Sequence, residues 1–278
     1  TGTGVELWVI DVASATARRI SDPILNCNLG RHYSWYTDNQ HLLVRVIPKD
    51  RPALIDQKVE LPRGPIVTVA EGKATQNRTF QDLLKNKTDE HNFESLVRSE
   101  IWKVDLNGNK SLYKEADLYL GLAFSPDGNY ILISKVGKPF SYAVPLGRFP
   151  QTSVVCDLQG KEIKIVNQVP LDEIRPKGFS AVRTGKRNMA GRDDKAASLY
   201  YVEALDGGDP AAKVEYRDEL FSWDAPFTSQ PVSLLKTKQR FAGVTWGNEK
   251  LAIAYDNWYD TRNAKTYLFD PSDPASQT

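Results

Sequence analysis

One short unit recurs along the chain: an aromatic or apolar strand that ends in an acidic residue and a turn. Its copies are centred on Trp8, Trp102, Val154, Tyr200 and Tyr267. Successive copies are 94, 52, 46 and 67 residues apart, and the spacings near 50 suit one four-stranded blade each, as in a β-propeller. The repeat therefore predicts an all-β fold built from antiparallel propeller blades.

Hairpin signals lie between the copies. In segment 122–133, Pro126 and Asp127-Gly128 form a turn between two apolar runs, and segments 33–44 and 243–254 follow the same plan. We expect these hairpins to be the first two strands of a blade and the repeated unit to be the next strand. The spacing predicts a partial β-propeller over residues 1–278, with about four to five blades of antiparallel four-stranded sheets.

The widest interval between copies contains a segment, at about 48–100, that departs from the β pattern. Residues 79–86 begin with Thr79, a residue that caps helices well, and they predict a short helix. Residues 89–98 predict a second helix. The segment is therefore expected to be a small helical insertion in the propeller.

Charge and composition exclude several classes of protein. Lys and Arg number 36 against 35 Asp and Glu, so net charge gives no reason to expect nucleic acid or an anionic membrane as a partner. No apolar run reaches the length of about 18 residues that a membrane span needs. Cys27 and Cys156 stand in unrelated contexts, and both a disulfide and two buried thiols are open readings. The N-terminus has no signal-peptide pattern, and we expect the chain to be a piece of a longer protein.

The usual catalytic and metal-binding patterns are missing from the sequence. His32, His41 and His91 do not stand at a metal-ligand spacing, so no metal or cofactor is expected. The string nearest to a nucleophile elbow, at 178–182 around Ser180, lacks the second Gly and the following helix. No catalytic residue is therefore expected within these 278 residues.

A basic cluster stands out between residues 175 and 195. Its members are Arg175, Lys177, Arg183, Lys186, Arg187, Arg192 and Lys195, against Asp193 and Asp194. One reading is an ordinary basic loop surface. The other is a positive rim that attracts acidic peptide side chains.

Several longer strings resemble the propeller of the glutamyl endopeptidase branch of the prolyl oligopeptidase family. They lie at 78–84, 145–150, 182–187, 192–209, 216–218, 240–246 and 258–262. The likeness covers about residues 5–270. One position departs from the pattern, because Gly191 stands where relatives usually have Trp before the residue equivalent to Arg192.

The resemblance implies the gating propeller of a serine peptidase that cleaves peptides after Glu. The Ser-Asp-His triad would belong to a C-terminal α/β-hydrolase domain that is absent from this sequence, and the propeller would admit peptides while excluding folded proteins. Arg183, Arg187 and Arg192 become candidates for substrate binding, because a carboxylate suits a bidentate arginine. The alternative is a stand-alone propeller scaffold that binds peptides or proteins. The expected location is periplasmic or secreted in a bacterium, with a plastid as the alternative.

Overall fold

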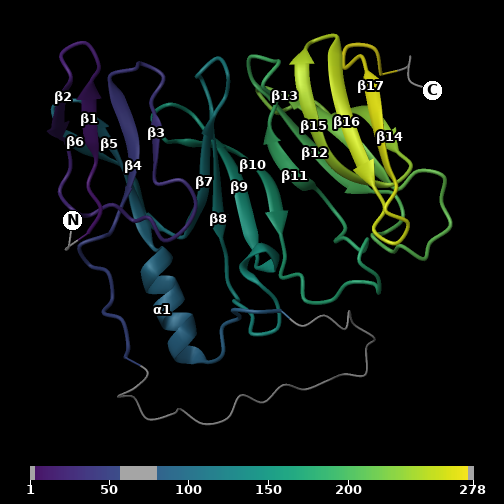
Figure 1. Cartoon of the computed structure of the whole chain (residues 1–278), viewed down its shortest axis with the longest axis horizontal. Coiled ribbons are helices and arrows are strands. Elements are labelled where there is room, and N and C mark those ends of the chain that lie inside the picture. Colours follow the sequence, from purple (N-terminus) through teal and green to yellow (C-terminus); the bar gives the residue numbers. More distant parts are fainter. Residues whose placement is uncertain (1–3, 57–79, 275–278) are drawn as a thin grey trace.

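The described part of the protein consists of five antiparallel sheets that follow one another along the chain (Figure 1). The structure, a computed structural model, describes residues 4–56 and 80–274. The first sheet pairs β1 (Trp8–Asp11) with β2 (Thr16–Arg19). The second contains β3 (Tyr33–Trp35), β4 (His41–Val46), β5 (Ser99–Asp105) and β6 (Lys110–Asp117).

The remaining three sheets continue this order. The third contains β7 (Tyr119–Phe124), β8 (Ile131–Val136), β9 (Gln151–Cys156) and β10 (Glu162–Val169). The fourth contains β11 (Arg187–Gly191), β12 (Ser198–Ala204), β13 (Asp218–Asp224) and β14 (Val232–Thr237). The fifth contains β15 (Arg240–Asn248), β16 (Leu251–Asn257) and β17 (Ala264–Phe269).

In every sheet the strands pair in sequence order. Successive up-and-down sheets of this kind are propeller blades, and the predicted all-β partial propeller is confirmed. Three of the sheets have the expected four strands, while the other two have three and two.

The repeated unit occupies the third strand in most blades, as predicted. The copies at Trp102, Val154 and Tyr267 lie on β5, β9 and β17, each the third strand of its sheet. The copy at Trp8 lies on β1, the first strand of a two-stranded sheet in the described residues. The copy at Tyr200 also departs from the prediction, because it lies on β12, the second strand. Its sheet has β13 in third place, and that strand is also aromatic and ends in Asp224. Two neighbouring strands with the same pattern made the prediction wrong at this blade.

The acidic residue of the repeated unit closes the turn that follows it. Oδ1 of Asp105 accepts the backbone N–H groups of the residues two and four positions later, at 2.8 and 2.9 Å. Asp157 does the same at 3.0 and 2.9 Å. An Asp side chain that binds the amides of its own turn replaces a backbone partner there. The acidic position in the repeat is therefore explained by turn geometry.

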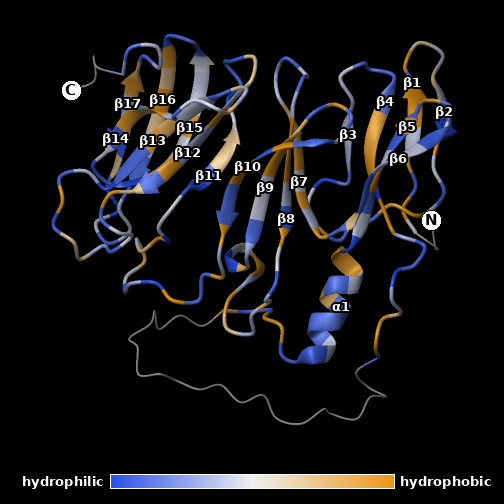
Figure 2. Cartoon of the chain, turned by 180° about the vertical axis from the view of Figure 1, so that it is seen from behind, coloured by the Kyte–Doolittle hydropathy of each residue, from blue (hydrophilic) through white to orange (hydrophobic). Residues whose placement is uncertain are grey.

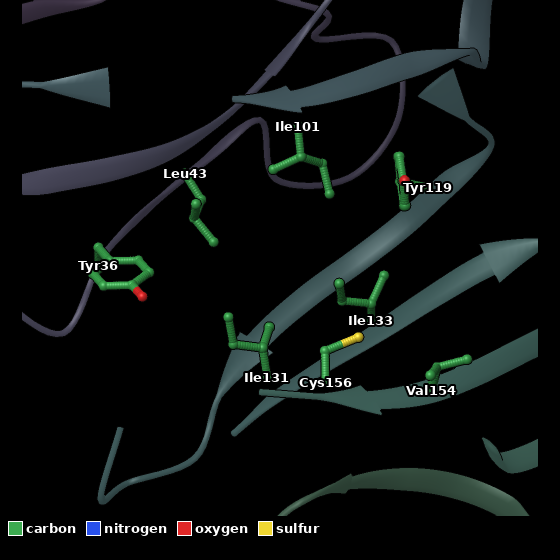
Figure 3. Close-up of a cluster of buried hydrophobic side chains, with 8 residues drawn as sticks. All are labelled: Tyr36, Leu43, Ile101, Tyr119, Ile131, Ile133, Val154 and Cys156. Carbon is green, nitrogen blue, oxygen red and sulfur yellow. The ribbon is translucent and has the colours of Figure 1, made fainter. Parts of the chain in front are cut away.

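Apolar side chains of neighbouring sheets form the core. In Figure 3, Leu43 and Ile101 of the second sheet face Ile131, Ile133 and Val154 of the third. Each of the five is at most 2% exposed. Alternate residues of a strand point to opposite faces, so each middle sheet supplies side chains to two such layers. Figure 2 shows hydrophobic residues concentrated on the strands and a largely hydrophilic helix α1 (Lys87–Val97).

The helical insertion contains one helix in its described part, α1, where the second helix was expected. The predicted helix at 79–86 is wrong for residues 80–86, while Thr79 lies outside the described residues. Asp82 has a φ of 56°, which a right-handed helix cannot accommodate. Asn86 instead caps α1, because its side chain accepts the N–H of Asp89 at 2.8 Å.

The longest connections lie on one side of the sheets, although residue 118 and segment 238–239 make short connections there, and the other side has turns of two to seven residues (Figure 1). We call the long side the connection face and define it by α1 and segments 137–150, 170–186, 205–217 and 258–263. The segments contact one another: the N–H of Val182 donates to the carbonyl of Gly208 at 3.1 Å. The 3-10 turn η1 (Leu146–Arg148) lies in the first of the loop segments.

Candidate functional site

Strand β11 divides the basic cluster between its two ends. Arg187 is the first residue of β11, next to the connection face, and Arg192 follows its last residue. Arg183 lies in segment 170–186, directly before the strand. The structure therefore brings Arg183 and Arg187 together and places Arg192 at the opposite end.

Arg192 uses its guanidinium within the protein. Its Nη2 lies 2.5 Å from Oδ2 of Asp194, and its Nη1 donates to the hydroxyl of Ser222 at 3.0 Å. The guanidinium also stacks 4.2 Å from the centre of the Trp246 ring. The residue is 1% exposed. Substrate binding by Arg192 stays a prediction, and a ligand would have to compete with these partners.

Arg183 and Arg187 line a cavity of about 320 Å³, which we call the arginine pocket. Its lining is Gly147, Gln151, Val169, Arg175, Val182, Arg183, Arg187 and Asn188. The third arginine, Arg175, belongs to the basic cluster but was not singled out from the sequence. Arg175 lies eight residues before Arg183 in the sequence. Because the path of the loop between them has no local pattern, the sequence did not predict that Arg175 would lie beside Arg183 and Arg187.

The three arginines are held by different partners. Nη2 of Arg187 donates to Oδ1 of Asp218 at 2.6 Å. Arg175 binds Oδ2 of Asp172 through Nε at 2.7 Å and also through Nη2. Within the described part of the chain, Arg183 donates to two backbone carbonyls, those of Thr184 and Lys186.

Arg183 is electrostatically disfavoured in this setting. Burial lowers the pKa of its guanidinium, and the positive charge of Arg187 lowers it further. Both causes act against the charged form. The negative charge of Asp172 acts in the opposite direction and offsets part of this lowering of the pKa.

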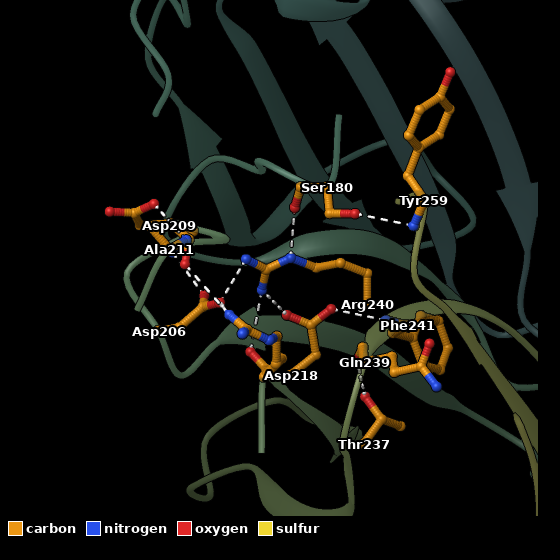
Figure 4. Close-up of polar contacts among 12 residues, drawn as sticks. Ser180, Asp206, Asp209, Ala211, Asp218, Thr237, Gln239, Arg240, Phe241 and Tyr259 are labelled. Atoms are coloured by element: carbon orange, nitrogen blue, oxygen red, sulfur yellow. Dashed lines mark hydrogen bonds and ion pairs between the residues drawn. The ribbon is translucent and has the colours of Figure 1, made fainter. Parts of the chain in front are cut away.

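A buried ionic network lies beside the pocket and joins the fourth and fifth sheets (Figure 4). Arg240 binds Oδ2 of Asp206 through Nη2 at 2.6 Å and Oδ1 of Asp218 through Nη1 at 3.1 Å. Arg217 also binds Oδ2 of Asp206, at 2.8 Å. Three of these residues fall within the strings 216–218 and 240–246 that carried the family resemblance. That overlap was the one sequence signal for the network.

Ser180 has a structural role in this network. Its carbonyl accepts Nε–H of Arg240 at 2.7 Å, and its hydroxyl accepts the N–H of Tyr259 at 3.2 Å. Its hydroxyl thus ties segment 170–186 to segment 258–263. In the described residues Ser180 lies in the loop between β10 and β11, and strand β11 follows it where a nucleophile elbow would have a helix.

Gly191 lines a small apolar cavity between the third and fourth sheets. The cavity measures about 30 Å³, and Phe124, Tyr130, Leu132 and Phe227 are among its other lining residues. This is the position at which the resemblance led us to expect Trp. The space beside Gly191 is mainly apolar and about the size of one water molecule.

The described residues contain no group of three or more His, Cys, Asp and Glu side chains that could hold a metal ion. Cys27 is an exposed free thiol and Cys156 a buried one, so the two are not paired. In the same residues, no helix is long and apolar enough to cross a membrane.

The fold and the pocket define a β-propeller portion with an arginine-lined recess on its connection face. The chain is 36% identical over 271 residues to a probable chloroplastic glutamyl endopeptidase of Oryza sativa subsp. japonica, and 34% identical over 271 residues to one of Arabidopsis thaliana. These matches cover 96% and 95% of this chain but only 29% and 28% of the relatives. No protein-family model matches the chain.

Solved structures also align with the chain. An acylaminoacyl peptidase of Pyrococcus horikoshii aligns with a TM-score of 0.49 at 12% identity, over 95% of this chain and 33% of that one. The β-propeller domain of the Trilobed protease from Pyrococcus furiosus aligns with a TM-score of 0.34 at 15% identity, over 95% and 73%. The propeller assignment itself rests on the strand order described above.

The chain is thus a partial β-propeller that is similar, over nearly its whole length, to one part of these two relatives. It spans less than a third of the length of these probable glutamyl endopeptidases.

Proposed function

We propose that this chain is the substrate-gating propeller of a serine peptidase that cleaves peptides after Glu. Residues 1–278 form the propeller portion, with the segment at about 48–100 as an insertion, and a C-terminal α/β-hydrolase domain of the same polypeptide supplies the triad. The observation that carries this proposal is the match of 96% of the chain to 29% of a glutamyl endopeptidase.

The connection face supports the preference for acidic peptides. Arg175, Arg183 and Arg187 meet there around one cavity, and none of its lining residues within 4–56 and 80–274 is acidic. Clustered cations at a recess raise the local concentration of anionic substrates and speed their association. A propeller with this surface would favour acidic peptides before they reach the catalytic residues.

Matched peptides test the proposal that this chain gates substrates while another domain of the same polypeptide cleaves them. Fluorogenic peptides that carry Glu or Gln before the scissile bond are offered to this chain and to the complete gene product. We expect the chain alone to leave both uncut, and the complete protein to cleave the Glu peptide in a manner blocked by a serine-directed inhibitor. Inhibitor-sensitive hydrolysis by the chain alone would reject the proposal.

The role of the basic cluster is tested by charge reversal in the complete protein. Arg183→Glu is the most informative reversal, since Arg187 and Arg192 hold buried ion pairs. We expect it to reduce turnover of Glu peptides while that of neutral peptides is retained. An equal loss for both would assign Arg183 a structural role.

The alternative function is a stand-alone scaffold that binds peptides or proteins. The gene beyond Thr278 discriminates between the two. A downstream Gly-x-Ser-x-Gly motif supports the peptidase, and a stop codon directly after Thr278 supports the scaffold.

Both named relatives are described as chloroplastic, in keeping with the plastid alternative. A periplasmic or secreted bacterial location stays a prediction. Fractionation of the source cells, with detection of the complete protein, decides between these compartments.

A further inference from the structure

The first and fifth sheets each leave one apolar face uncovered by the described residues. On the first sheet this face carries Trp8 and Ile10, and on the fifth it carries Ile253, Tyr255 and Leu268. We call these two surfaces the end faces. They do not cover each other, because Figures 1 and 2 show the two sheets at opposite ends of the row of sheets. We propose that each end face is a blade-packing surface, covered in the complete protein by a further propeller blade of the same polypeptide.

Positions relative to the acidic residue of the repeated unit tell which neighbouring sheet a side chain faces. In the third sheet the acidic residue is Asp157. Cys156 and Val154, one and three residues before it, belong to the core cluster shared with the second sheet. Val155, two residues before it, belongs to the cluster shared with the fourth sheet. Because alternate residues of a strand point to opposite faces, the same positions face the preceding and the following sheet in the other blades.

The first sheet follows this rule on one face only. Its acidic residue is Asp11, and Val9, two residues earlier, packs on the core cluster shared with the second sheet. Ile10 and Trp8, one and three residues earlier, are 67% and 53% exposed. In the second sheet Val104, equivalent to Ile10, packs toward the first sheet and is 3% exposed. Ile10 and Trp8 therefore occupy the positions of side chains that pack on a preceding sheet.

The fifth sheet follows the rule on the opposite face only. Its acidic residue is Asp270, and Phe269, directly before it, packs in the cluster shared with the fourth sheet. Leu268, two residues before Asp270, is 71% exposed, whereas its equivalent Val155 is 1% exposed. Ile253 lies opposite Leu268 on β16, and paired residues share one face of a sheet. This end face is therefore equivalent to a face that is buried wherever a following sheet is present.

The turn after β17 is the kind of turn that leads into a fourth strand. The N–H two residues beyond Asp105 donates to its Oδ1 at 2.8 Å, and the N–H three residues beyond donates to its carbonyl at 3.1 Å. The same pair of bonds follows Asp157, at 3.0 and 3.0 Å, and Asp270, at 2.8 and 3.2 Å. The turns at Asp105 and Asp157 lead directly into β6 and β10, the fourth strands of their sheets. The repeated turn points to polypeptide of the same propeller as the occupant beside β17.

The relatives have enough chain for such blades. Each of the two is more than three times as long as the part that this chain matches. A blade takes about 40 to 50 residues, so a polypeptide of that length can hold further blades beside other domains. A second copy of this chain also carries both end faces, and the experiment separates it from a further blade. The proposal does not rest on the proposed peptidase function, which leaves the number of blades open.

Thiol labelling tests the proposal. Leu268→Cys and Ile10→Cys are made in this chain and in the complete gene product. The matched control is Ile165→Cys on β10, where the side chain is 50% exposed on a sheet that has both neighbours. Labelling by a maleimide is followed by peptide mass spectrometry, which separates the new thiols from Cys27.

The two proteins should differ at the end faces alone. We expect the end-face thiols to react at least about tenfold more slowly in the complete protein than in this chain, because a packed blade must first open locally. The control thiol should react equally in both. Leu268→Asp gives a second readout: it should lower the midpoint of thermal unfolding by about 5 °C or more in the complete protein and by less than about 2 °C in this chain.

The proposal is overturned if either end-face thiol reacts equally fast in the two proteins, or if Leu268→Asp shifts both midpoints equally. It is also overturned if these thiols become protected in this chain as its concentration rises, since a second copy is then the occupant. Protected end faces in a complete protein that does not cleave Glu peptides would support this proposal and reject the proposed function. Cleavage of Glu peptides with unprotected end faces would do the reverse.

Discussion

Asp218 and Arg240 form a buried ion pair that joins two sheets. Oδ1 of Asp218, on β13, lies 3.1 Å from Nη1 of Arg240, on β15. The same carboxylate accepts Nη2–H of Arg187 at 2.6 Å and the N–H of Phe241 at 2.8 Å. One side chain therefore fixes the start of β15 against the fourth sheet and also holds a wall of the arginine pocket.

Replacing Asp218 should destabilise the protein strongly. Asp218→Asn leaves the positive charges of Arg187 and Arg240 buried without this counter-charge, and a broken buried ion pair costs about 3 to 5 kcal/mol. The free energy of unfolding in urea measures the loss. Glu215→Gln, at an exposed position on the neighbouring connection, should change it by less than about 0.5 kcal/mol. Equal small effects of the two substitutions would contradict the structural role of Asp218.

Asp206 should make stability depend on pH in the acid range. Burial alone would raise the pKa of its carboxyl, but hydrogen bonds from Arg240 and Arg217 bring that pKa below its usual value. A carboxyl with a lowered folded pKa stabilises the fold fully above its unfolded pKa, about 3.9. This contribution is lost as the pH falls through the folded pKa.

The measurement compares wild type with Asp206→Asn by urea unfolding from pH 7 to pH 3. We expect a constant difference in the free energy of unfolding at the upper end and a shrinking difference below about pH 4. A difference that stays constant down to pH 3 would show that the charge of Asp206 does not contribute.

Ile133 should contribute to stability through core packing. It is 2% exposed in the layer between the second and third sheets, and Ile133→Ala should cost about 2 to 5 kcal/mol. Ile165→Ala removes the same atoms from β10, where the side chain is 50% exposed, and should cost much less. Thermal and urea unfolding of both variants measure the difference. Similar losses would argue against the sheet-to-sheet layer.

The cavity beside Gly191 makes substitution there favourable. A Cβ at this position meets no atom within 4 Å, so Gly191→Ala should stabilise the protein by about 0.4 to 1 kcal/mol through a less flexible unfolded chain. Gly208→Ala is the opposing control. Its φ is +78° and its Cβ would lie 2.1 Å from the carbonyl oxygen of Val182, so it should destabilise. Differential scanning calorimetry of both variants checks the signs, and a lower midpoint for Gly191→Ala would contradict the open space.

The blades could be predicted because their signals are local. Strand periodicity and the turn chemistry of Asp105, Asp127 and Asp157 act within a few residues, and these signals located most third strands correctly. Tyr200 on β12 and Trp223 on β13 lie on adjacent strands with the same aromatic pattern, so the sequence does not distinguish the second strand from the third. The pairing of β13 with both β12 and β14 shows that β13 is the third strand. The helix predicted at 79–86 was wrong because Thr79 was taken as its capping residue. The residue that caps a helix is Asn86, at the start of α1.

The site was harder to predict because long loops assemble it. The sequence drew attention to Arg183, Arg187 and Arg192 as one cluster, but a strand of five residues spans roughly 16 Å and separates Arg192 from the other two. Arg175 joins the pocket through the path of segment 170–186, which no local pattern encodes. The arginine partners Asp206 and Asp218 lie near the two ends of the connection between β12 and β13. Both are outside residues 175–195, so the local charge balance of that range did not include them.

The unequal connections have a consequence for how such a protein can change. The tight turns hold each blade in register through side chains such as Asp105 and Asp157, so length changes there would shift strand pairing. Segments 170–186 and 205–217 do not set strand register, although Ser180, Asp206 and Gly208 anchor parts of them. Insertions and deletions should accumulate in them, and a library confined to these two segments would diversify ligand preference on an unchanged framework.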